Sequence, residues 1–570
     1  MIIKLNGLWK FTIDMGACGT PYFDVDFPRD FWDLVYVPSV WNFYKDIYYL
    51  YEGIGWYVKE FYIEEFDDFS FAEIYFEGVN YICEVYLNGK KIGIHEGGYT
   101  PFSFDISEFL KKGRNILVVK VDNRRHLLRM PYVVGWFNYG GIHRPVYIKI
   151  SKKVKIDAFV LYFEEENGVV DYKVKLKNLD DKFYYFLNIE DENGFFYEAK
   201  GKINDFIGKI EFPLKKFEKW FPDLPKTYKL SFGIIDENGN LLDKVEKNFG
   251  IRKLKVENYK IFINDKEIKL KGINYLPINP VDGLVFTEEM IKKDLKLIKE
   301  LNANIIRVHF PLSEEFFNLC DKEGIMVWCD IPVYCLEKYA GVPEDFFTKE
   351  ENYKLAEQYF KETFSYYNHH PSIITWSIGN ENSTFLPGAG EFFYKLVEYA
   401  RKLEKNRFIS YACLILMRNE DESFFEKLDI IGLNEYFGWY DKLGKHYEKW
   451  EEKNFDLKIV KEKLSEFFNK HKKPVAITEF GADSLPGFRA DKFVLGSEDY
   501  HSMLLQESFK IFREFPQITG YFPFSFNDYP DPSKPNVRFW SDQINHKGVV
   551  SFNRSKKAVF DTLKKIYENI

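Results

Sequence analysis

The pattern of hydrophobic and polar positions changes twice along the chain, and each stretch predicts a different fold. Residues 1–152 carry short runs in which apolar and polar residues alternate, such as 82–87 and 115–121. Asn88-Gly89 follows the first of these runs directly and is typical of a tight hairpin turn. Alternation with a period of two, broken by such turns, predicts antiparallel strands. We therefore expect an all-β sandwich over residues 1–152.

Residues 153–252 show the same alternation of apolar and polar positions, over a shorter stretch of chain. Asn-Gly pairs at 167–168, 193–194 and 238–239 predict tight turns between runs such as 171–177 and 229–235. A stretch of about 100 residues with this spacing is typical of an immunoglobulin-like β-sandwich.

From residue 253 to residue 570, short apolar runs alternate with helical patterns such as 287–301 and 392–404. Eight of the runs predict strands, at 270–275, 305–309, 326–330, 373–378, 409–413, 430–436, 475–479 and 520–526. Eight strands alternating with helices over about 300 residues predict a (β/α)8 barrel, the TIM barrel. The chain is therefore expected to be multidomain, with two β-sandwiches followed by a barrel.

Composition excludes several classes of function. The chain is 46% hydrophobic and 29% charged, which is ordinary for a soluble globular protein. A net charge of −8 lacks the basic surface of a nucleic-acid-binding protein. No apolar run approaches the ~20 residues of a membrane-spanning helix. We expect neither a nucleic acid nor a membrane as partner.

Cysteine use and the first residues bear on the cellular compartment. The six cysteines are scattered and form no Cys-x-x-Cys pair. The N-terminus has no basic segment followed by the apolar run of a signal peptide. Both observations favour a cytoplasmic protein with reduced thiols. Four glutamines beside abundant lysine and glutamate are typical of a thermophilic source.

Two glutamates, Glu381 and Glu479, lie where the fourth and seventh predicted strands end. The chemistry of a TIM barrel sits at the C-terminal ends of its strands. Carboxylates facing each other across this rim can approach to about 5–5.5 Å, the separation that a retaining glycosidase needs. One such glutamate alone is more often a solvated or capping residue, but two within dense polar motifs favour catalysis. Glu435 is a third candidate, ranked lower because it points outward if Tyr436 points inward.

Several motifs resemble glycoside hydrolase family 2, in the domain order of that family. Asn368-His-His-Pro-Ser-Ile-Ile-Thr-Trp-Ser-Ile-Gly-Asn-Glu381 resembles its acid/base signature, and Ile477-Thr-Glu-Phe-Gly481 resembles its nucleophile motif. Further segments resemble its jelly-roll-like sugar-binding sandwich and its early barrel: 5–10, 55–57, 85–89, 138–146, 302–311 and 323–330. The resemblance therefore covers nearly the whole chain.

This resemblance implies a retaining exo-β-glycosidase that works through a covalent glycosyl-enzyme, without cofactor or metal. It implies Glu381 as acid/base and Glu479 as nucleophile. Asn380 would bond the substrate 2-hydroxyl, and Tyr436 would orient the nucleophile. His309, at the end of the second strand, is expected in the pocket. The acid needs a raised pKa, which burial and the nearby nucleophile would supply.

Within the family, four segments resemble members that cleave β-glucuronides: 434–440, 477–487, 496–500 and 545–548. The first begins at Asn434 and would place Tyr436 and Tyr440 at the sugar. In the last, Asn545 and Lys547 could both point at the sugar carboxylate and form charge-assisted hydrogen bonds. The glycine at 548 would allow close backbone approach. The resemblance thus favours a β-glucuronidase.

Alternatives stay open. An Asn-x-Lys-Gly segment also occurs in relatives that cleave galactosides, so a β-galactosidase or β-galacturonidase is the second reading, and an inactive carbohydrate-binding protein the third. Gly135, Phe524 and Ser541 stand where relatives often carry Asp, Trp and Arg, and Arg538 is a candidate replacement for that arginine. Family members are commonly dimers or tetramers, so the resemblance implies a homo-oligomer.

Overall fold

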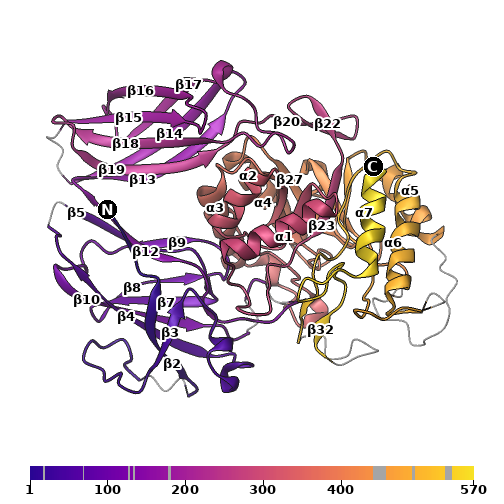
Figure 1. Ribbon diagram of the computed structural model, residues 1–570, viewed down its shortest axis with the longest axis horizontal. Coiled ribbons are helices and arrows are strands. Elements are labelled where there is room, and N and C mark those ends of the chain that lie inside the picture. The colour runs from indigo at the N-terminus through magenta and orange to yellow at the C-terminus, as the bar shows by residue number, and fades with distance from the viewer. Residues whose placement is uncertain are drawn as a thin grey trace.

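The computed structural model describes residues 1–570 except 17–19, 68–69, 126–128, 132–134, 178–181, 441–457, 491–493 and 533–541. The described chain forms two β-sandwiches and one closed barrel (Figure 1). In Figure 1 the indigo first sandwich and the magenta second sandwich lie beside the barrel, whose colours run to orange and yellow. The predicted multidomain architecture is confirmed.

The first sandwich packs a four-stranded sheet, in the order β1-β12-β5-β9, with a six-stranded sheet, β3-β2-β4-β10-β7-β8. Its core buries large aromatic side chains such as Trp9, Trp41 and Tyr57. Asn88 and Gly89 both have positive φ, 52° and 80°, as the predicted tight hairpin turn requires. The strands are β1 (Ile2–Lys4), β2 (Gly7–Asp14), β3 (Asp33–Val37), β4 (Ile54–Ile63), β5 (Ser70–Phe76), β6 (Val79–Asn80), β7 (Ile82–Leu87), β8 (Lys90–Glu96), β9 (Phe102–Asp105), β10 (Gly113–Asp122), β11 (Gly141–Ile142) and β12 (Val146–Lys152).

The second sandwich has a three-stranded sheet, β13-β14-β17, and a four-stranded sheet, β16-β15-β18-β19. The turn predicted at Asn167-Gly168 is wrong, because both residues begin β14. A Cβ on Gly168 would lie 2.1 Å from Cζ of Phe212, so the glycine makes room for a ring of the neighbouring strand. The strands are β13 (Val154–Phe163), β14 (Asn167–Leu176), β15 (Phe183–Glu190), β16 (Phe196–Lys202), β17 (Ile207–Pro213), β18 (Tyr228–Asp236) and β19 (Leu241–Phe249).

Eight parallel strands, β23 to β30, close the barrel, with Leu270 opposite Gly520 where the first strand meets the last. All eight predicted strands are present. The last one ends at Tyr521, five residues before the predicted end. The strands are β23 (Leu270–Asn274), β24 (Ile305–Val308), β25 (Met326–Asp330), β26 (Ile373–Asn380), β27 (Phe408–Cys413), β28 (Ile430–Asn434), β29 (Val475–Glu479) and β30 (Ile518–Tyr521). Short strands outside the barrel are β20 (Leu254–Glu257), β21 (Lys260–Ile263), β22 (Lys266–Ile268), β31 (Tyr529–Pro530) and β32 (Ile544–Asn545).

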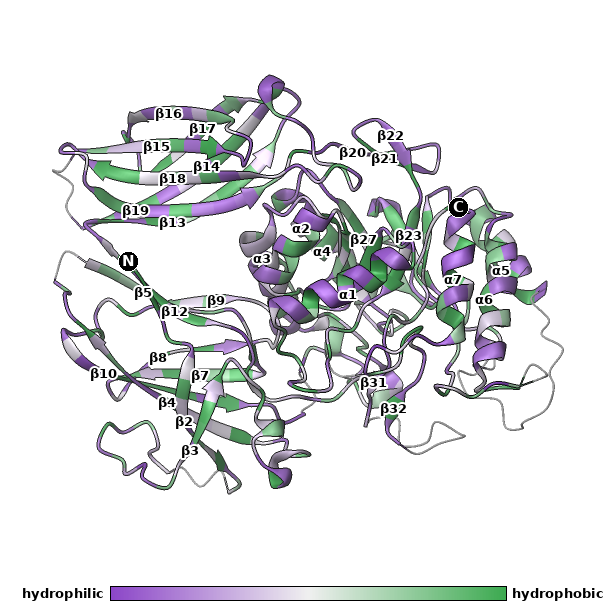
Figure 2. Ribbon diagram, in the orientation of Figure 1, coloured by the Kyte–Doolittle hydropathy of each residue, from purple (hydrophilic) through white to green (hydrophobic). Residues whose placement is uncertain are grey.

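The helices around the barrel bury one face each. In α1 the side chains of Ile291, Leu295 and Ile298 are buried at helical spacing, and Thr287 caps its first turn by accepting a hydrogen bond from Met290 N. Figure 2 shows hydrophilic and hydrophobic positions alternating on these helices and on the sandwich strands. No helix in the described ranges combines the length and apolar composition needed to cross a membrane. The helices are α1 (Glu288–Glu300), α2 (Glu314–Glu323), α3 (Glu350–Tyr367), α4 (Ala389–Leu403), α5 (Lys458–Lys470), α6 (Glu498–Phe512) and α7 (Ala558–Glu568).

Buried arginines connect both sandwiches to the barrel. Arg144, just before β12, donates from Nη2 to the carbonyl of Pro311 at 2.6 Å. Arg252, after the second sandwich, donates from Nε to the carbonyl of Pro371 at 2.7 Å. Because each guanidinium is buried against backbone carbonyls, these contacts fix the sandwiches relative to the barrel.

Candidate active site

The two candidate glutamates lie at the C-terminal ends of their strands, as the barrel rule predicts. Glu479 is the last residue of β29 and is buried. Glu381 directly follows β26 and is partly exposed. Its φ of 49° lies in the left-handed region, which is uncommon for a residue other than glycine. Its backbone N–H donates to the carbonyl of Ala412 at 3.0 Å, which anchors this turn to β27.

Both carboxylate oxygens of Glu479 accept hydrogen bonds, one from strand β24 and one from the loop that follows β28. Arg307 Nη1, on β24, lies 2.8 Å from Oε1, and the Tyr436 hydroxyl donates to Oε2 at 2.7 Å. The other nitrogen of the guanidinium, Nη2, binds Asp330 Oδ2 at 2.7 Å. These charge-assisted bonds set the orientation of the carboxylate before any ligand arrives.

Glu381 is held differently. Asn434 Nδ2 donates to its Oε1 at 2.6 Å, and the Cys335 thiol donates to its Oε2 at 3.8 Å. Burial of the carboxyl, and then the negative charge of Glu479, raise the pKa of Glu381 to about 8. At neutral pH the group therefore carries a proton that it can donate.

Asn380 joins the two carboxylates through shared partners. Its Oδ1 accepts from Arg307 Nη2 at 2.7 Å and from Asn434 Nδ2 at 3.1 Å. Within the described part of the chain, Asn380 Nδ2 and His309 Nε2 are buried without a hydrogen-bond partner. Buried polar groups are rarely left unpaired, so these two atoms point to a polar ligand between the glutamates.

Aromatic side chains from two domains surround His309. Trp136 comes from the first sandwich, and its ring lies parallel to His309 with centroids 6.2 Å apart. Tyr334 and Phe524 lie 5.0 Å and 6.0 Å from the same imidazole. Gly135, beside Trp136, contributes no acidic side chain, and a Cβ there would meet the Tyr334 hydroxyl at 3.2 Å. The first sandwich therefore contributes an aromatic side chain to the surroundings of His309.

Lys547 and Asn545 lie on the segment that includes β32, close to Tyr440. Lys547 Nζ lies 5.4 Å from the centroid of Tyr440, whose ring lies 5.2 Å from that of Tyr436. The amide oxygen of Asn545 accepts from the Lys547 backbone at 3.2 Å, and its Nδ2 is buried without a partner in the described residues. The ammonium of Lys547 is bound to Asp483 Oδ2 at 2.6 Å.

The glycine at 548 serves the fold. A Cβ on Gly548 would lie 2.2 Å from the backbone nitrogen of Asp528, so the close approach it allows is between two segments of this chain. Ser541 and Arg538, the positions compared with a family arginine, lie outside the described residues.

The structure brings all nine predicted site residues to one end of the barrel and adds others that sequence reasoning did not assign. The rule that polar residues near the C-terminal ends of barrel strands form the site would have found Arg307, the last but one residue of β24, and Asp330, the last of β25. Asp483 and Trp136 carry no such signal, since they come from a loop and another domain. Glu435 is buried and accepts a hydrogen bond from the Phe437 backbone on its own loop, and burial raises its pKa to about 8.

A closed parallel barrel with this pair of carboxylates defines the protein as a glycoside hydrolase. Residues 2–152 match the sugar-binding domain of glycosyl hydrolases family 2, residues 146–252 match a second domain of that family, and residues 254–570 match its TIM barrel domain. The chain belongs to glycosyl hydrolases family 2, and the predicted resemblance is confirmed.

Two similar proteins match nearly the whole chain, and a third matches two thirds of it. A β-glucuronidase from Paenibacillus borealis is 26% identical over 98% of this chain and 94% of its own length. The structure of a β-glucuronidase from Ruminococcus gnavus in complex with D-glucaro 1,5-lactone is 25% identical, has a TM-score of 0.86 and covers 100% of this chain and 97% of its own. A β-galactosidase from Thermoanaerobacter pseudethanolicus is 28% identical over 67% of this chain and 52% of its own length.

Proposed function

We propose that the protein is a retaining exo-β-glucuronidase that releases D-glucuronate from β-glucuronides by double displacement. The observation that carries the sugar assignment is the buried ammonium of Lys547 close to Tyr440, two residues from Asn545, whose Nδ2 is buried without a hydrogen-bond partner in the described residues. Similarity to β-glucuronidases over nearly the whole chain supports it.

In the first step, Glu479 attacks the anomeric carbon while Glu381 protonates the glycosidic oxygen. The hydrogen bonds from Tyr436 and Arg307 hold the attacking carboxylate in place. Glu381 is protonated at neutral pH because burial and the charge of Glu479 raise its pKa to about 8. Bond cleavage leaves the glycosyl group esterified to Glu479 and the aglycone with the proton.

In the second step, Glu381 removes a proton from water, which attacks the anomeric carbon and releases Glu479. Esterification removes the charge of Glu479, which is one of the causes that raise the pKa of Glu381. The pKa of Glu381 therefore falls once the glycosyl-enzyme forms, and Glu381 can then accept a proton from water. Asn380 Nδ2, which has no hydrogen-bond partner within the described residues, would donate to the sugar 2-hydroxyl, a bond that strengthens in the transition state.

The sugar carboxylate would be bound by Asn545 and Lys547, with Tyr440 and Tyr436 along the sugar. Lys547 supplies a charge, and Asn545 Nδ2 supplies a donor that has no partner within the described residues. His309 would border the same sugar, with its Nε2 lying 3.8 Å from Glu479 Oε1.

The test compares p-nitrophenyl β-glucuronide, β-galactoside and β-galacturonide as substrates. The proposal expects the glucuronide to have the highest kcat/KM. A β-galactosidase, the function of one partial relative, would prefer the galactoside, and a carbohydrate-binding protein without catalysis would release nothing from any of them.

A second experiment assigns the two carboxylates. In Glu479→Ala, azide can take the place of the missing nucleophile and yield the α-glycosyl azide. In Glu381→Ala, with a leaving group that needs no proton, azide instead attacks the glycosyl-enzyme and yields the β-azide. The opposite products would reverse the roles, and unchanged hydrolysis in either variant would refute them.

We also infer a cytoplasmic homo-oligomer, a dimer or tetramer, with domains at 1–152, 153–252 and 253–570. Five described cysteines are buried free thiols, which fits a reducing compartment. Leu34, Tyr36 and Ile47 of the first sandwich are more than half exposed, and such apolar side chains fit a subunit contact. Light scattering after gel filtration tests the assembly, and a monomer at micromolar concentration would contradict it. Thermal unfolding of the purified protein tests the thermophilic character expected from composition.

A further inference from the structure

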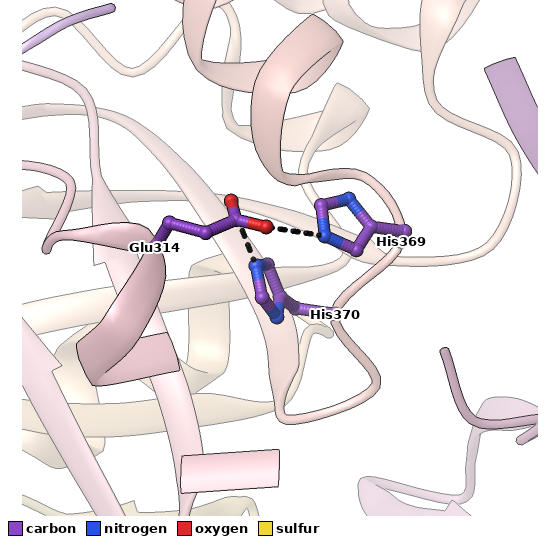
Figure 3. A group of neighbouring side chains, drawn as sticks. All are labelled: Glu314, His369 and His370. Carbon is purple, nitrogen blue, oxygen red and sulfur yellow. Dashed lines mark hydrogen bonds and ion pairs between the residues drawn. The ribbon is translucent and has the colours of Figure 1, made fainter. Parts of the chain in front are cut away.

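A cluster of two imidazoles and one carboxylate lies in the barrel domain and includes none of the residues assigned to the candidate active site (Figure 3). Glu314 is the first residue of α2, and His369 and His370 lie in the loop between α3 and β26. Figure 3 shows both imidazoles pointing at the carboxylate of Glu314. His369 Nε2 lies 3.1 Å from Oε1 and His370 Nε2 lies 3.4 Å from Oε2, and one ligand atom from each residue fits within 4.8 Å.

The two nitrogen–oxygen distances, each to a different oxygen of Glu314, are close to the separation of two ligands on one metal ion. Two ligand atoms about 2.0–2.1 Å from a tetrahedral zinc ion lie roughly 3.3 Å from one another. Two imidazoles with one carboxylate form a donor set suited to zinc and similar transition metals, whereas magnesium and calcium prefer oxygen ligands. We propose that Glu314, His369 and His370 bind a divalent transition-metal cation, zinc in the first instance, with water as the fourth ligand.

The residues behind the cluster support this. His370 Nδ1 lies 2.6 Å from Asp321 Oδ2, and its Nε2 points at Glu314. The other oxygen of Asp321 accepts from the Ser372 backbone at 3.0 Å, which fixes the carboxylate. A carboxylate that holds the far nitrogen of a metal-ligating histidine is a recurring feature of zinc sites. Both imidazoles are almost fully buried, at 3% and 0% exposure, and so are rigidly placed.

One cation already lies nearby. Lys247 Nζ, on β19 of the second sandwich, lies 3.6 Å from Glu314 Oε1. Its side chain is 22% exposed and its flexible stem lets the ammonium turn outward to solvent when a metal takes its place. Without a metal, the Lys247 ammonium partly neutralises the Glu314 carboxylate. A bound metal would take over this role.

The position of the cluster suggests what a bound cation does. The Glu314 backbone N–H donates to Glu77 Oε1 of the first sandwich at 2.7 Å, and Lys247 belongs to the second sandwich. All three domains therefore meet at Glu314. A cation here would hold the start of α2 to the loop before β26 and stabilise this junction, because a ligand that binds only the folded state stabilises it.

The test uses the full chain, stripped with a chelator and then titrated with zinc chloride alone. We expect one zinc per chain by calorimetry and elemental analysis, and a higher melting temperature. Glu314→Gln and His369→Gln should each weaken binding at least about tenfold and lose the thermal shift. The matched control is His471→Gln, which removes another imidazole bonded to a glutamate, Glu422, and should bind as the wild type does.

Two results would overturn the proposal. One is a stripped wild type that takes up no zinc. The other is zinc binding by Glu314→Gln as tight as by the control. If a variant fails to fold, X-ray absorption of the wild-type zinc complex decides: two imidazoles and oxygen ligands support the site, and thiolate ligands refute it.

Discussion

Lys547 Nζ lies 2.6 Å from Asp483 Oδ2, and both side chains are almost completely buried. The cation proposed to recognise the substrate is therefore one half of an ion pair before any ligand binds. Asp483 also accepts from the His546 backbone at 2.8 Å, so it holds the backbone and the side chain of the segment together. A uronate must approach an ammonium whose position is already set, which reduces the cost of ordering it on binding.

Lys547→Ala should lower kcat/KM for p-nitrophenyl β-glucuronide by about 30- to 1000-fold, the scale of 2–4 kcal/mol for removing one partner of a buried charge pair. A neutral β-glycoside has no carboxylate to lose, so any residual galactoside hydrolysis should change little. Steady-state kinetics on both substrates checks this. An equal loss on both would mean that Lys547 supports the fold of the pocket rather than the uronate.

Asp483→Asn should lower the melting temperature, because it leaves the Lys547 charge buried without its counter-ion, a change that costs about 3–5 kcal/mol. A bound glucuronate can supply the missing negative charge. Thermal shift with D-glucuronate should therefore be larger in this variant than in the wild type. A smaller shift would show that the sugar carboxylate does not reach Lys547.

The alkaline limb of the kcat/KM profile should fall near pH 8, since Glu381 must be protonated to act as the acid and its pKa is raised to about 8. The hydrogen bond from Asn434 stabilises the charged form of Glu381 and lowers that pKa. Asn434→Ala should therefore move the limb to higher pH while reducing the rate. A substrate with a strongly activated leaving group needs less acid assistance and should flatten the limb in both proteins. A downward shift in Asn434→Ala would contradict the assignment.

Glu381→Gln should stabilise the protein in alkali. The pKa of Glu381 is raised from 4.5 to about 8, so its contribution to stability is full below pH 4.5 and is lost as the pH rises through 8. At about 1.4 kcal/mol for each pKa unit, the buried charge costs the wild type at most about 5 kcal/mol above pH 8. Glutamine stays neutral, so melting temperatures should agree at pH 5 and favour the variant at pH 9. Equal values at pH 9 would show that the carboxylate is well solvated.

Tyr436→Phe removes one of the two charge-assisted hydrogen bonds to Glu479. Such a bond contributes about 1.5–3 kcal/mol, so kcat/KM should fall about 10- to 150-fold. The matched control is Tyr567→Phe, a buried phenol that donates to the carbonyl of Gly272 at 2.6 Å. That variant should lose stability but little activity. Similar kinetic losses in both would point to a general packing effect.

Local patterns along the chain were enough to predict the elements. Strand β7 has the predicted bounds, and α1 lies within the predicted helical stretch 287–301, because alternation and helical spacing act over a few residues. The two glutamates could be predicted as well, since a strand end in a barrel is a known place for chemistry.

Barrel closure and domain packing decided which side chains, far apart in the sequence, meet in the candidate site. Arg307 and Glu479 are 172 positions apart and meet only because their strands end on the same rim. Asp483 and Lys547, 64 positions apart, pair because two loops meet beside the pocket. Charged partners so far apart leave no periodic signal in the chain, since their attraction operates only after hydrophobic burial has set the fold.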